Sequence, residues 1–270
     1  MSEHFKITFG ICTYNRKNIV SKSAASLAKV RGIENVTIKV YDDCSTEYNE
    51  DYLKAIFPKG TEIIRRISNG GADINTSEMY EDFLKGNDEW LFNADSDLIY
   101  RSDIIDAIQE YKDKSKGFMT LFNCINHHTI GESDYFYEKD SVGAAGCLLR
   151  RDVVELILKH IRYRVTGFDV GFSKLLRNKG YKLLATKQSF VQHIGVSGFN
   201  SRNINFDFGE SYICDDRENG QIIEETFEEY IKRINRFREK FSWKAFYFIT
   251  SIPRRIRKIF RILIIIIQKK

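Results

Sequence analysis

The chain has 270 residues, of which 43% are hydrophobic and 29% are charged. This length and composition suit one large α/β domain with a short appendage, and the presence of only two prolines argues against a long disordered linker. The net charge of +5 comes without any signature of a nucleic-acid-binding module, so we exclude nucleic acid as a partner. The five cysteines are an odd number with no C-x-x-C spacing, which suggests neither a disulfide framework nor a zinc site and fits a cytosolic protein.

Short apolar runs in the first hundred residues predict strands at residues 6–12, 36–41, 62–66 and 89–94. Between the first two strands, residues 19–28 have apolar side chains at helical spacing. A turn at residues 68–71 leads into a second helix that ends near Lys85. Strand, helix and strand in this order form a βαβ unit, and such units build parallel sheets that bind ligands at the carboxyl ends of their strands.

The second half of the chain mixes helices with less regular segments. Helices are predicted at residues 104–111, from an N-cap at Asp152 to about His160, at residues 172–179 with Gly180 as the C-cap, and at residues 224–241. Residues 117–150 are predicted to be irregular or β, and a strand at residues 189–191 precedes His193. We therefore expect a main domain at residues 1–220 and a helical extension at residues 221–270.

Polar side chains follow three of the predicted strands, at the point where each strand ends. Thr13 to Arg16 follow the first strand, Asp42 to Ser45 follow the second, and Asp95 to Asp97 follow the fourth. Side chains two apart in an extended chain point to the same side, so Asp95 and Asp97 can converge on one divalent cation that keeps positions open for phosphate oxygens. A solvated turn is the alternative for this pair.

The ordered set of these motifs resembles the family 2 glycosyltransferases, which have the GT-A fold. The resemblance covers roughly residues 5–200 and continues through Gly167-Phe168-Asp169, the sequence RNKGY at 177–181 and Gln192-His193-Ile194-Gly195. It implies an α/β fold with a mixed, mainly parallel central sheet flanked by helices, plus a C-terminal helical extension. It also implies an inverting hexosyltransferase that moves a sugar from a nucleotide-diphosphate sugar, here expected to be a UDP-sugar, to a saccharide or lipid-linked acceptor.

The same resemblance implies a metal site. Mn²⁺ or Mg²⁺ is expected to be held by Asp97, while Asp95 contacts the ribose or reaches the metal through water. His193 is expected to be a third metal ligand or a contact for the diphosphate, and an imidazole beside two carboxylates favours manganese over magnesium. The bound cation would neutralise the leaving diphosphate as its bond to the sugar breaks.

Nucleotide-sugar recognition is expected in the loops after the first two strands. Tyr14 can present a ring face to the base, and Asp43 can accept a hydrogen bond from a ring N–H, with Thr13 and Asp42 close by. Arg16 is expected to hold phosphate. The alternatives are that Tyr14 is a core residue with a satisfied hydroxyl group and that Arg16 is an ordinary surface arginine.

Sugar transfer also needs a base that deprotonates the acceptor hydroxyl. The family usually has Glu-Asp at this point; Phe168 stands in place of the Glu, and Asp169 matches the Asp that is the usual base in inverting members. A helix cap is the alternative role for Asp169. The side chains of His127 and His128 diverge in a strand, so we interpret them as loop structure or, at most, as contacts for the acceptor.

Two other functions remain as alternatives. The first is a non-catalytic protein that binds nucleotide sugars, saccharides or a membrane while retaining the fold, which Phe168 in place of an acid supports. The second is a nucleotidyltransferase, but that enzyme would need a Gly-rich, basic loop after the first strand. Thr13-Tyr14-Asn15-Arg16 is not such a loop.

The chain ends in a segment that is both basic and apolar. From Lys232 to Lys270, Glu239 is the sole acidic residue, and on a helix after Pro253 basic side chains line one face and apolar side chains the other. The uninterrupted apolar run at residues 262–267 is much shorter than the roughly 20 residues that a membrane span requires. We expect a helix on the anionic cytoplasmic face of the cell membrane, with cell-envelope polysaccharide synthesis as its setting. A helix that packs on the core or forms a homodimer is the alternative.

Overall fold

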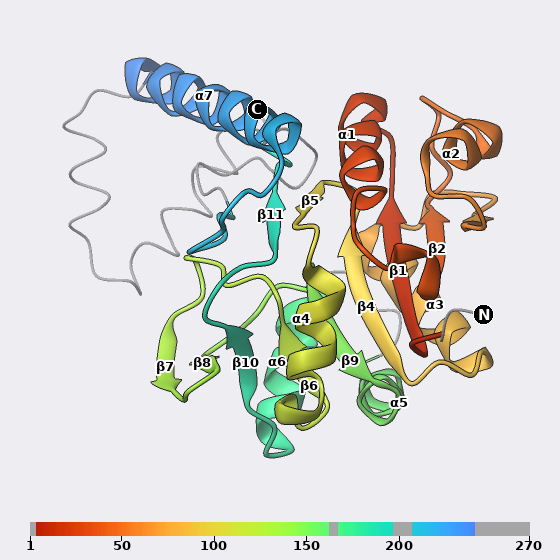
Figure 1. Cartoon of the computed structure of the whole chain (residues 1–270), viewed down its shortest axis with the longest axis vertical. Helices are drawn as coiled ribbons and strands as arrows, with labels where there is room; N and C mark the ends of the chain where they lie inside the picture. Colours follow the sequence, from red (N-terminus) through yellow and green to blue (C-terminus); the bar gives the residue numbers. More distant parts are fainter. Residues whose placement is uncertain (1–3, 162–166, 197–206, 241–270) are drawn as a thin grey trace, which may run out of the picture. The chain divides into compact units, whose positions relative to one another are not determined.

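The computed structural model of the chain describes residues 4–161, 167–196 and 207–240. The chain divides into two compact units, one of residues 1–223 and one of residues 224–270. The described strands and the helices α1 to α6 all belong to the first unit (Figure 1). The fold that positions the candidate site is therefore the fold of the first unit.

A nine-stranded sheet runs through the first unit in the order β3-β2-β1-β4-β9-β6-β10-β8-β7. Its strands are β1 (Ile7–Thr13), β2 (Thr37–Asp42), β3 (Glu62–Arg65), β4 (Trp90–Asp95), β6 (Phe118–Thr120), β7 (Thr129–Glu132), β8 (Phe136–Lys139), β9 (Cys147–Arg150) and β10 (Leu183–Thr186). The strands from β3 to β4 are parallel to one another, and β9 joins β4 in the antiparallel direction. The sheet is mixed and its N-terminal part is parallel, so the predicted α/β class is confirmed.

Helices cover both faces of this sheet. They are α1 (Lys17–Leu27), α2 (Glu50–Ile56), α3 (Ala72–Lys85), α4 (Ile104–Tyr111), α5 (Arg151–His160) and α6 (Phe168–Asn178), with the 3₁₀ turns η1 (Ile33–Asn35) and η2 (Asp113–Ser115) between them. Side chains alternate across a strand, so Phe92 packs on one face with α1, α2 and α4, while Leu91 packs on the other with α3, α5 and α6. Each face of the sheet therefore has its own hydrophobic core.

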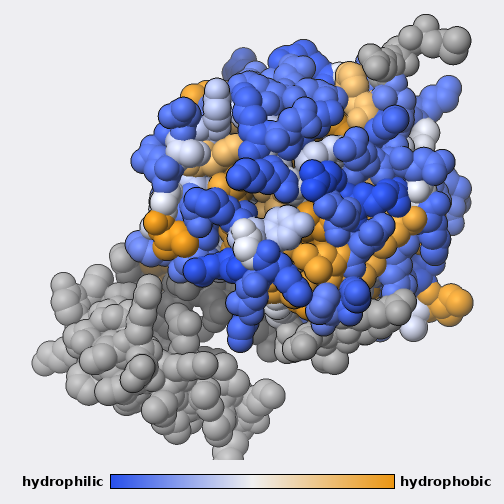
Figure 2. All heavy atoms as spheres, turned by 90° about the horizontal axis from the view of Figure 1, so that it is seen from below, coloured by the Kyte–Doolittle hydropathy of each residue, from blue (hydrophilic) through white to orange (hydrophobic). Residues whose placement is uncertain are grey.

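The surface of the described residues is mainly hydrophilic on the side seen from below in Figure 2. Hydrophobic side chains gather there in small areas between the hydrophilic ones. This distribution is ordinary for a protein surface, because there is never enough polar surface to cover a folded chain completely.

A second sheet pairs the short strands β5 (Leu98–Tyr100) and β11 (Val191–His193). The two strands are antiparallel, with His193 opposite Leu98. The backbone N–H of Ile194 donates to the carbonyl of Asp97 at 2.8 Å. This pairing brings the segment around His193 next to the residues that follow β4.

Two helices begin earlier than the sequence pattern predicts. α5 begins before Asp152, so the prediction that Asp152 is the N-cap is wrong. The Asp152 carboxylate instead accepts hydrogen bonds from the guanidinium of Arg150 at 2.7 and 2.8 Å. α6 begins before the predicted residue 172, and Gly167 precedes it with a left-handed backbone (φ 73°) that glycine adopts without strain. The helix therefore carries Asp169 within its first turn, not at the capping position.

The helix α7 (Arg217–Lys240) also begins earlier than predicted, ahead of residue 224. Within the first unit, Lys29 donates to Asp216 and Glu218 at 2.7 and 2.6 Å, which holds the start of this helix near the end of α1. The predicted tail after Pro253 lies outside the described residues. In the part of the chain that the structure describes, no helix has the length and apolar character needed to cross a membrane.

Candidate functional site

The carboxyl ends of β1, β2 and β4 lie side by side at one edge of the sheet. Cys12 in β1 is opposite Asp95 in β4, and Thr13 in β1 is opposite Asp42 in β2. The backbone N–H of Asp43 donates to the carbonyl of Thr13 at 3.0 Å. The three polar clusters that follow these strands in the sequence are therefore neighbours in space.

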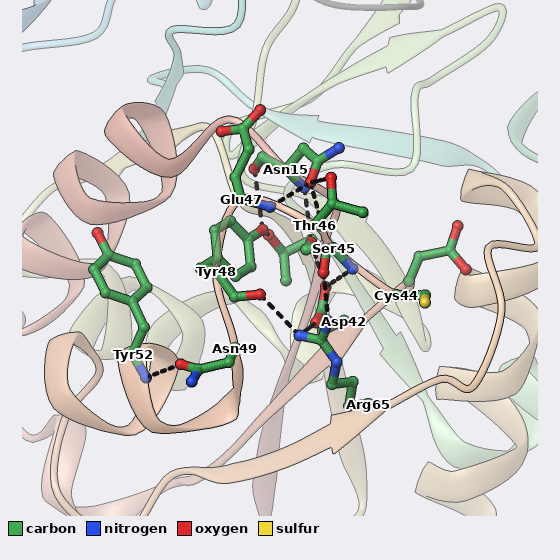
Figure 3. A network of polar contacts seen from close by, with 12 residues as sticks. Asn15, Asp42, Cys44, Ser45, Thr46, Glu47, Tyr48, Asn49, Tyr52 and Arg65 are labelled. Carbon is green, nitrogen blue, oxygen red and sulfur yellow. Dashed lines mark hydrogen bonds and ion pairs between the residues drawn. The ribbon is translucent and has the colours of Figure 1, made fainter.

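Asn15 ties the loop after β1 to the loop after β2 (Figure 3). Its Oδ1 accepts from the backbone N–H groups of Thr46 and Glu47 at 2.8 and 3.2 Å, and its own N–H donates to Ser45 Oγ at 2.8 Å. Asn15 has a left-handed backbone (φ 51°), which asparagine adopts more readily than most residues. The two loops thus form one hydrogen-bonded unit, and this linking role was not evident from the sequence.

Thr13 and Asp42, which the sequence placed near the nucleotide, are buried inside this unit. Asp42 is fully buried, and it accepts from the N–H of Ser45 at 3.1 Å and from Arg65 Nη1 at 2.6 Å. Thr13 Oγ1 lies 2.5 Å from the hydroxyl oxygen of Tyr48. Both side chains therefore hold the loops in shape, and direct contact with a nucleotide stays a prediction for each.

The two residues predicted to contact the nucleotide base have different surroundings. Asp43 is 2% exposed, and its two oxygens accept from the backbone N–H groups of Gly70 and Gly71, each at 2.8 Å. One of these oxygens also lies 3.0 Å from Arg66 Nε. A carboxylate has about four lone-pair sites, so Asp43 has room for one further donor. Tyr14 is 43% exposed and is therefore not a core residue.

Arg16, Asp97 and His193 meet around one buried carboxylate. Asp97 is 4% exposed, and its Oδ2 lies 2.8 Å from Arg16 Nη1 and 3.1 Å from His193 Nε2. Arg16 occupies the position before α1 with a left-handed backbone (φ 59°). Because its guanidinium contacts a buried carboxylate, Arg16 is not an ordinary surface arginine. The structure thus brings together three of the residues that the sequence singled out, from the loop after β1, the turn after β4 and the strand β11.

The charges around Asp97 set the pKa values at this site. Burial alone would raise the pKa of Asp97, but the neighbouring His193 and Arg16 outweigh burial and hold that pKa well below its usual range. Burial, together with the negative charge of Asp97, raises the pKa of Asp95 to about 6. Asp97 is therefore the firmly ionised carboxylate of the pair.

Two features of the cluster fit a divalent cation. Asp97 Oδ1 is buried and has no hydrogen-bond partner among the described residues, and a carboxylate with an imidazole is a donor set that manganese accepts. Within the described ranges, no group of three or more His, Cys, Asp or Glu side chains could hold a metal. Asp97 and His193 are the donors that fit a cation here, and metal binding by Asp95, Asp97 and His193 stays a prediction.

Asp169 lies in the first turn of α6, close to the same edge of the sheet. Its Oδ1 accepts from the backbone N–H of Val170 at 2.7 Å, which leaves the second oxygen for another group. Burial and the negative charge of Asp97 are the main causes of the raised pKa of Asp95. Asp169 is near enough for its negative charge to raise that pKa further. Among the described residues, only Oδ1 of Asp169 has a hydrogen-bond partner, so its second oxygen can accept a proton near the Asp97 cluster.

Phe168, which replaces the family's usual acid, serves the hydrophobic core. It is 2% exposed, and its ring centroid lies 5.5 Å from that of Tyr80 and 5.9 Å from that of Phe172. Both pairs have the edge-to-face geometry that aromatic rings prefer. The side chain therefore points into the core and leaves Asp169 as the acidic residue at this turn.

Gly195 belongs to the site, although we assigned it no role from the sequence. A Cβ atom at this position would lie 2.1 Å from Asp97 Oδ2 and 2.9 Å from His193 Cε1. Real side chains do not approach so closely, so any other residue would displace the carboxylate or the imidazole. The available signal was the place of Gly195 in the motif Gln192-His193-Ile194-Gly195.

Comparisons with known proteins point to one family. The model described as "Glycosyl transferase family 2" matches residues 8–182, and no curated protein matches the chain. A crystal structure of S. aureus TarS 1-349 in complex with UDP-GlcNAc aligns over 93% of this chain and 82% of its own, with a TM-score of 0.56 and 14% identity. A second crystal structure of S. aureus TarS 1-349 aligns over 68% of this chain and 59% of its own, with a TM-score of 0.51 and 13% identity. At these identities the structures share the fold alone.

Proposed function

Because the chain belongs to glycosyltransferase family 2, we propose that it transfers a sugar from a nucleotide-diphosphate sugar to a hydroxyl group of a saccharide or lipid-linked acceptor. The family and the structural neighbours give it the GT-A fold of a glycosyltransferase. We propose a UDP-sugar as the donor, because a neighbour aligned over 93% of this chain was solved with UDP-GlcNAc. The donor screen below tests that choice.

The cluster of Arg16, Asp97 and His193 carries this proposal. It lies at the carboxyl ends of β1 and β4, the edge at which open α/β sheets bind their ligands. Asp97 and His193 would hold Mn²⁺ or Mg²⁺ there. The planar guanidinium of Arg16 suits phosphate oxygens, so it would exchange its contact with Asp97 for a contact with the donor's diphosphate.

In the proposed reaction the acceptor oxygen bonds to the anomeric carbon while the bond from that carbon to the diphosphate oxygen breaks. A single displacement of this kind inverts the configuration at the anomeric carbon. Asp169 takes the proton of the acceptor hydroxyl on the oxygen that Val170 does not engage. A bound metal would supply positive charge that offsets the charge on the leaving diphosphate.

Calorimetry with a panel of UDP-sugars, each with and without Mn²⁺, tests the donor site. Wild type is expected to bind one of them in a cation-dependent manner. Asp97→Asn keeps the size of the side chain and loses its charge, so affinity should fall by at least about tenfold. Asp51→Asn removes an exposed carboxylate from α2 and serves as the control. Unchanged affinity and unchanged dependence on Mn²⁺ in Asp97→Asn would rule out this site.

Asp169→Asn separates catalysis from donor binding. An amide cannot accept the acceptor's proton, so turnover should fall by about a thousandfold while donor affinity stays nearly constant. Donor hydrolysis and transfer are measured alongside calorimetry on the same preparation. If the variant retains more than about a tenth of the rate, Asp169 is structural and the base lies elsewhere.

We also propose that the enzyme works at the cytoplasmic face of the cell membrane, in cell-envelope polysaccharide synthesis. The support comes from the tail after Pro253, whose sequence has one basic and one apolar face. Such a helix binds anionic membrane surfaces by charge attraction and by shallow insertion of its apolar face. Sedimentation with vesicles tests this part of the proposal.

A further inference from the structure

His127 is held by neighbouring residues at three points. Its backbone N–H donates to the carbonyl of Cys124 at 3.3 Å, and its carbonyl accepts from Nζ of the buried Lys139 at 3.2 Å. Its ring atom Nδ1 lies 3.0 Å from Ser141 Oγ. The imidazole of this loop residue therefore has a fixed position and a fixed orientation.

The partners of Ser141 decide which ring nitrogen carries the proton. Ser141 Oγ donates its one hydrogen to Asp140 Oδ1 at 3.0 Å, so towards His127 it can act only as an acceptor. His127 Nδ1 must then carry a proton and donate it to Ser141. In the neutral ring this leaves Nε2 without a proton, as a hydrogen-bond acceptor.

The helix α6 connects this loop to Asp169. Asp169, Ser173 and Arg177 are spaced by four residues and therefore share one side of the helix. Ser173 Oγ donates to the carbonyl of Val142 at 3.1 Å, and Arg177 Nη1 donates to the carbonyl of Asp140 at 3.0 Å. The segment that orients the imidazole is thus fastened to the side of α6 that presents the proposed base.

The surroundings of the half-buried ring favour its neutral form, and a glycine lies beside Nε2. Burial lowers the pKa of His127, and the carboxylates of Asp207, Asp140 and Asp169 oppose this effect only in part. A Cβ atom at Gly143 would lie 3.8 Å from Nε2. Because residue 143 is a glycine, no side chain from that position fills the space beside Nε2.

We propose that His127 binds the acceptor saccharide: Nε2 accepts a hydrogen bond from one sugar hydroxyl and so presents a neighbouring hydroxyl to Asp169. This inference rests on the proposed function, in which Asp169 is the base. The ligand class is a saccharide with two neighbouring hydroxyl groups, of which one is bound and the other reacts. Positioning by such a contact contributes to acceptor affinity and not to donor affinity.

Nitrogen NMR of the full-length protein, labelled with ¹⁵N at histidine, tests the tautomer and the contact. Near neutral pH, Nδ1 of His127 is expected to be protonated and Nε2 unprotonated, and Ser141→Ala should abolish this preference. Methyl glucoside, methyl galactoside and methyl N-acetylglucosaminide are the probes, and at least one should shift the Nε2 resonance. A proton on Nε2, or no shift with any of the three, would overturn the proposal.

Two substitutions separate the contact from a structural role. His127→Asn keeps a group near the position of Nδ1 but has no acceptor near that of Nε2, whereas the longer side chain of His127→Gln places its amide oxygen near Nε2. The KM for the best methyl glycoside should rise about tenfold in His127→Asn and stay within about threefold in His127→Gln. Donor hydrolysis should be unchanged in both, and His128→Ala, which alters the adjacent exposed histidine, is the control.

Each outcome of the kinetic experiment decides a separate question. Equal KM values for His127→Asn and wild type would overturn the role of His127, as would an equal rise in His128→Ala. If wild type neither binds nor hydrolyses any UDP-sugar, the proposed UDP-sugar donor is wrong. In that case the NMR titration with the methyl glycosides still decides whether Nε2 binds a sugar hydroxyl.

Discussion

The carboxylate of Asp97 and the imidazole of His193 can approach each other because Gly195 has no side chain. A methyl group at Gly195 would have to occupy the space that Asp97 Oδ2 already fills. Over-packing of this kind moves the surrounding groups, since protein interiors are close-packed. Because it has no side chain, Gly195 therefore allows the Asp97 carboxylate to keep its position.

Gly195→Ala is accordingly expected to lower donor affinity by at least about tenfold without unfolding the protein. Calorimetry with a UDP-sugar and Mn²⁺ measures the affinity, and circular dichroism checks the fold. Gly220→Ala is the matched control, because a Cβ atom there would meet Cys214 Sγ at an ordinary 3.7 Å. Full donor affinity in Gly195→Ala would mean that Asp97 and His193 lie outside the donor site.

The sequence identified the charged residues of the site better than it identified the groups that hold them. Arg16, Asp97 and His193 were found because each belongs to a motif next to a predicted strand, and the structure brings all three together. Arg65 was missed as the partner of Asp42, because a contact between neighbouring strands leaves no trace in local spacing. The linking role of Asn15 was missed because its side-chain hydrogen bonds are made to another loop, which local sequence spacing does not reveal.

At the scale of loops, Asn15 is the main link between the segments that follow β1 and β2. Asn15→Ala removes the oxygen that Thr46 and Glu47 use and places a less suitable residue at a positive φ. We expect a loss of about 2 kcal/mol of unfolding free energy, a fall of roughly 4–8 °C in Tm, and weaker donor binding. Thermal unfolding and calorimetry measure these effects.

Asn15→Asp is the control for that change. It keeps a side-chain oxygen at the same distance from the backbone and also tolerates a left-handed conformation. Stability and donor affinity should therefore remain closer to wild type than in Asn15→Ala. If the two variants behave alike, the hydrogen bonds from Thr46 and Glu47 do not hold the loops together.

The helix α3 is fixed to β2 by a pH-dependent contact. Asp82 Oδ2 accepts from Lys39 Nζ at 2.8 Å and from the hydroxyl group of Tyr41 at 2.9 Å. Burial alone would raise the pKa of Asp82, but these two partners outweigh it and hold the pKa below its ordinary value of 3.8. A depressed carboxyl pKa in the folded state adds stability above the unfolded-state value, and this stability disappears as the pH falls towards the folded-state pKa.

Wild type should therefore be more stable than Asp82→Asn by about 1 kcal/mol near neutral pH, and this difference should shrink as the pH falls below about 4. Urea unfolding at a series of pH values measures both proteins. Glu155→Gln alters an exposed carboxylate in α5 and should show little difference at any pH. A stability difference that stays constant down to pH 3 would contradict the role assigned to Lys39 and Tyr41.

Element prediction succeeded where apolar runs were long and failed where elements were short. The strands β1, β2 and β4 differ from the expected residues by one position at each end, because their apolar runs are continuous. α2 was not predicted because it has only seven residues, although Asn49 accepts from the N–H of Tyr52 at 3.0 Å as an N-cap should. β5 was not predicted because three residues are too few to show a period.

At the scale of the whole molecule, the tail after Pro253 is expected to govern attachment to membranes. Deletion of residues 253–270 should release the protein from phosphatidylglycerol vesicles and leave transfer to a soluble acceptor largely unchanged. The reason is that every residue of the candidate site precedes residue 196, whereas the basic and apolar faces follow Pro253. Vesicle sedimentation and a transfer assay measure the two properties.

Salt and lipid composition provide the controls for the tail. Binding of the full-length chain should weaken with added salt, because screening removes the electrostatic attraction, and it should be weaker with uncharged phosphatidylcholine vesicles. If the truncated chain still sediments with anionic vesicles, the membrane contact lies elsewhere. If it unfolds or changes its oligomeric state, the tail belongs to the core or to a homodimer interface.

Because His193 comes from β11, the proposed cation site is completed late in the synthesis of the chain. The strands β1 to β4 are synthesised by residue 95, but the imidazole that joins Asp97 arrives only with residue 193. At typical synthesis rates this delay lasts roughly 5 to 20 seconds. During that interval, and in any fragment that ends before β11, the loops after β1 and β2 exist without His193. A chain interrupted during synthesis therefore lacks His193, one of the two residues of the proposed cation site.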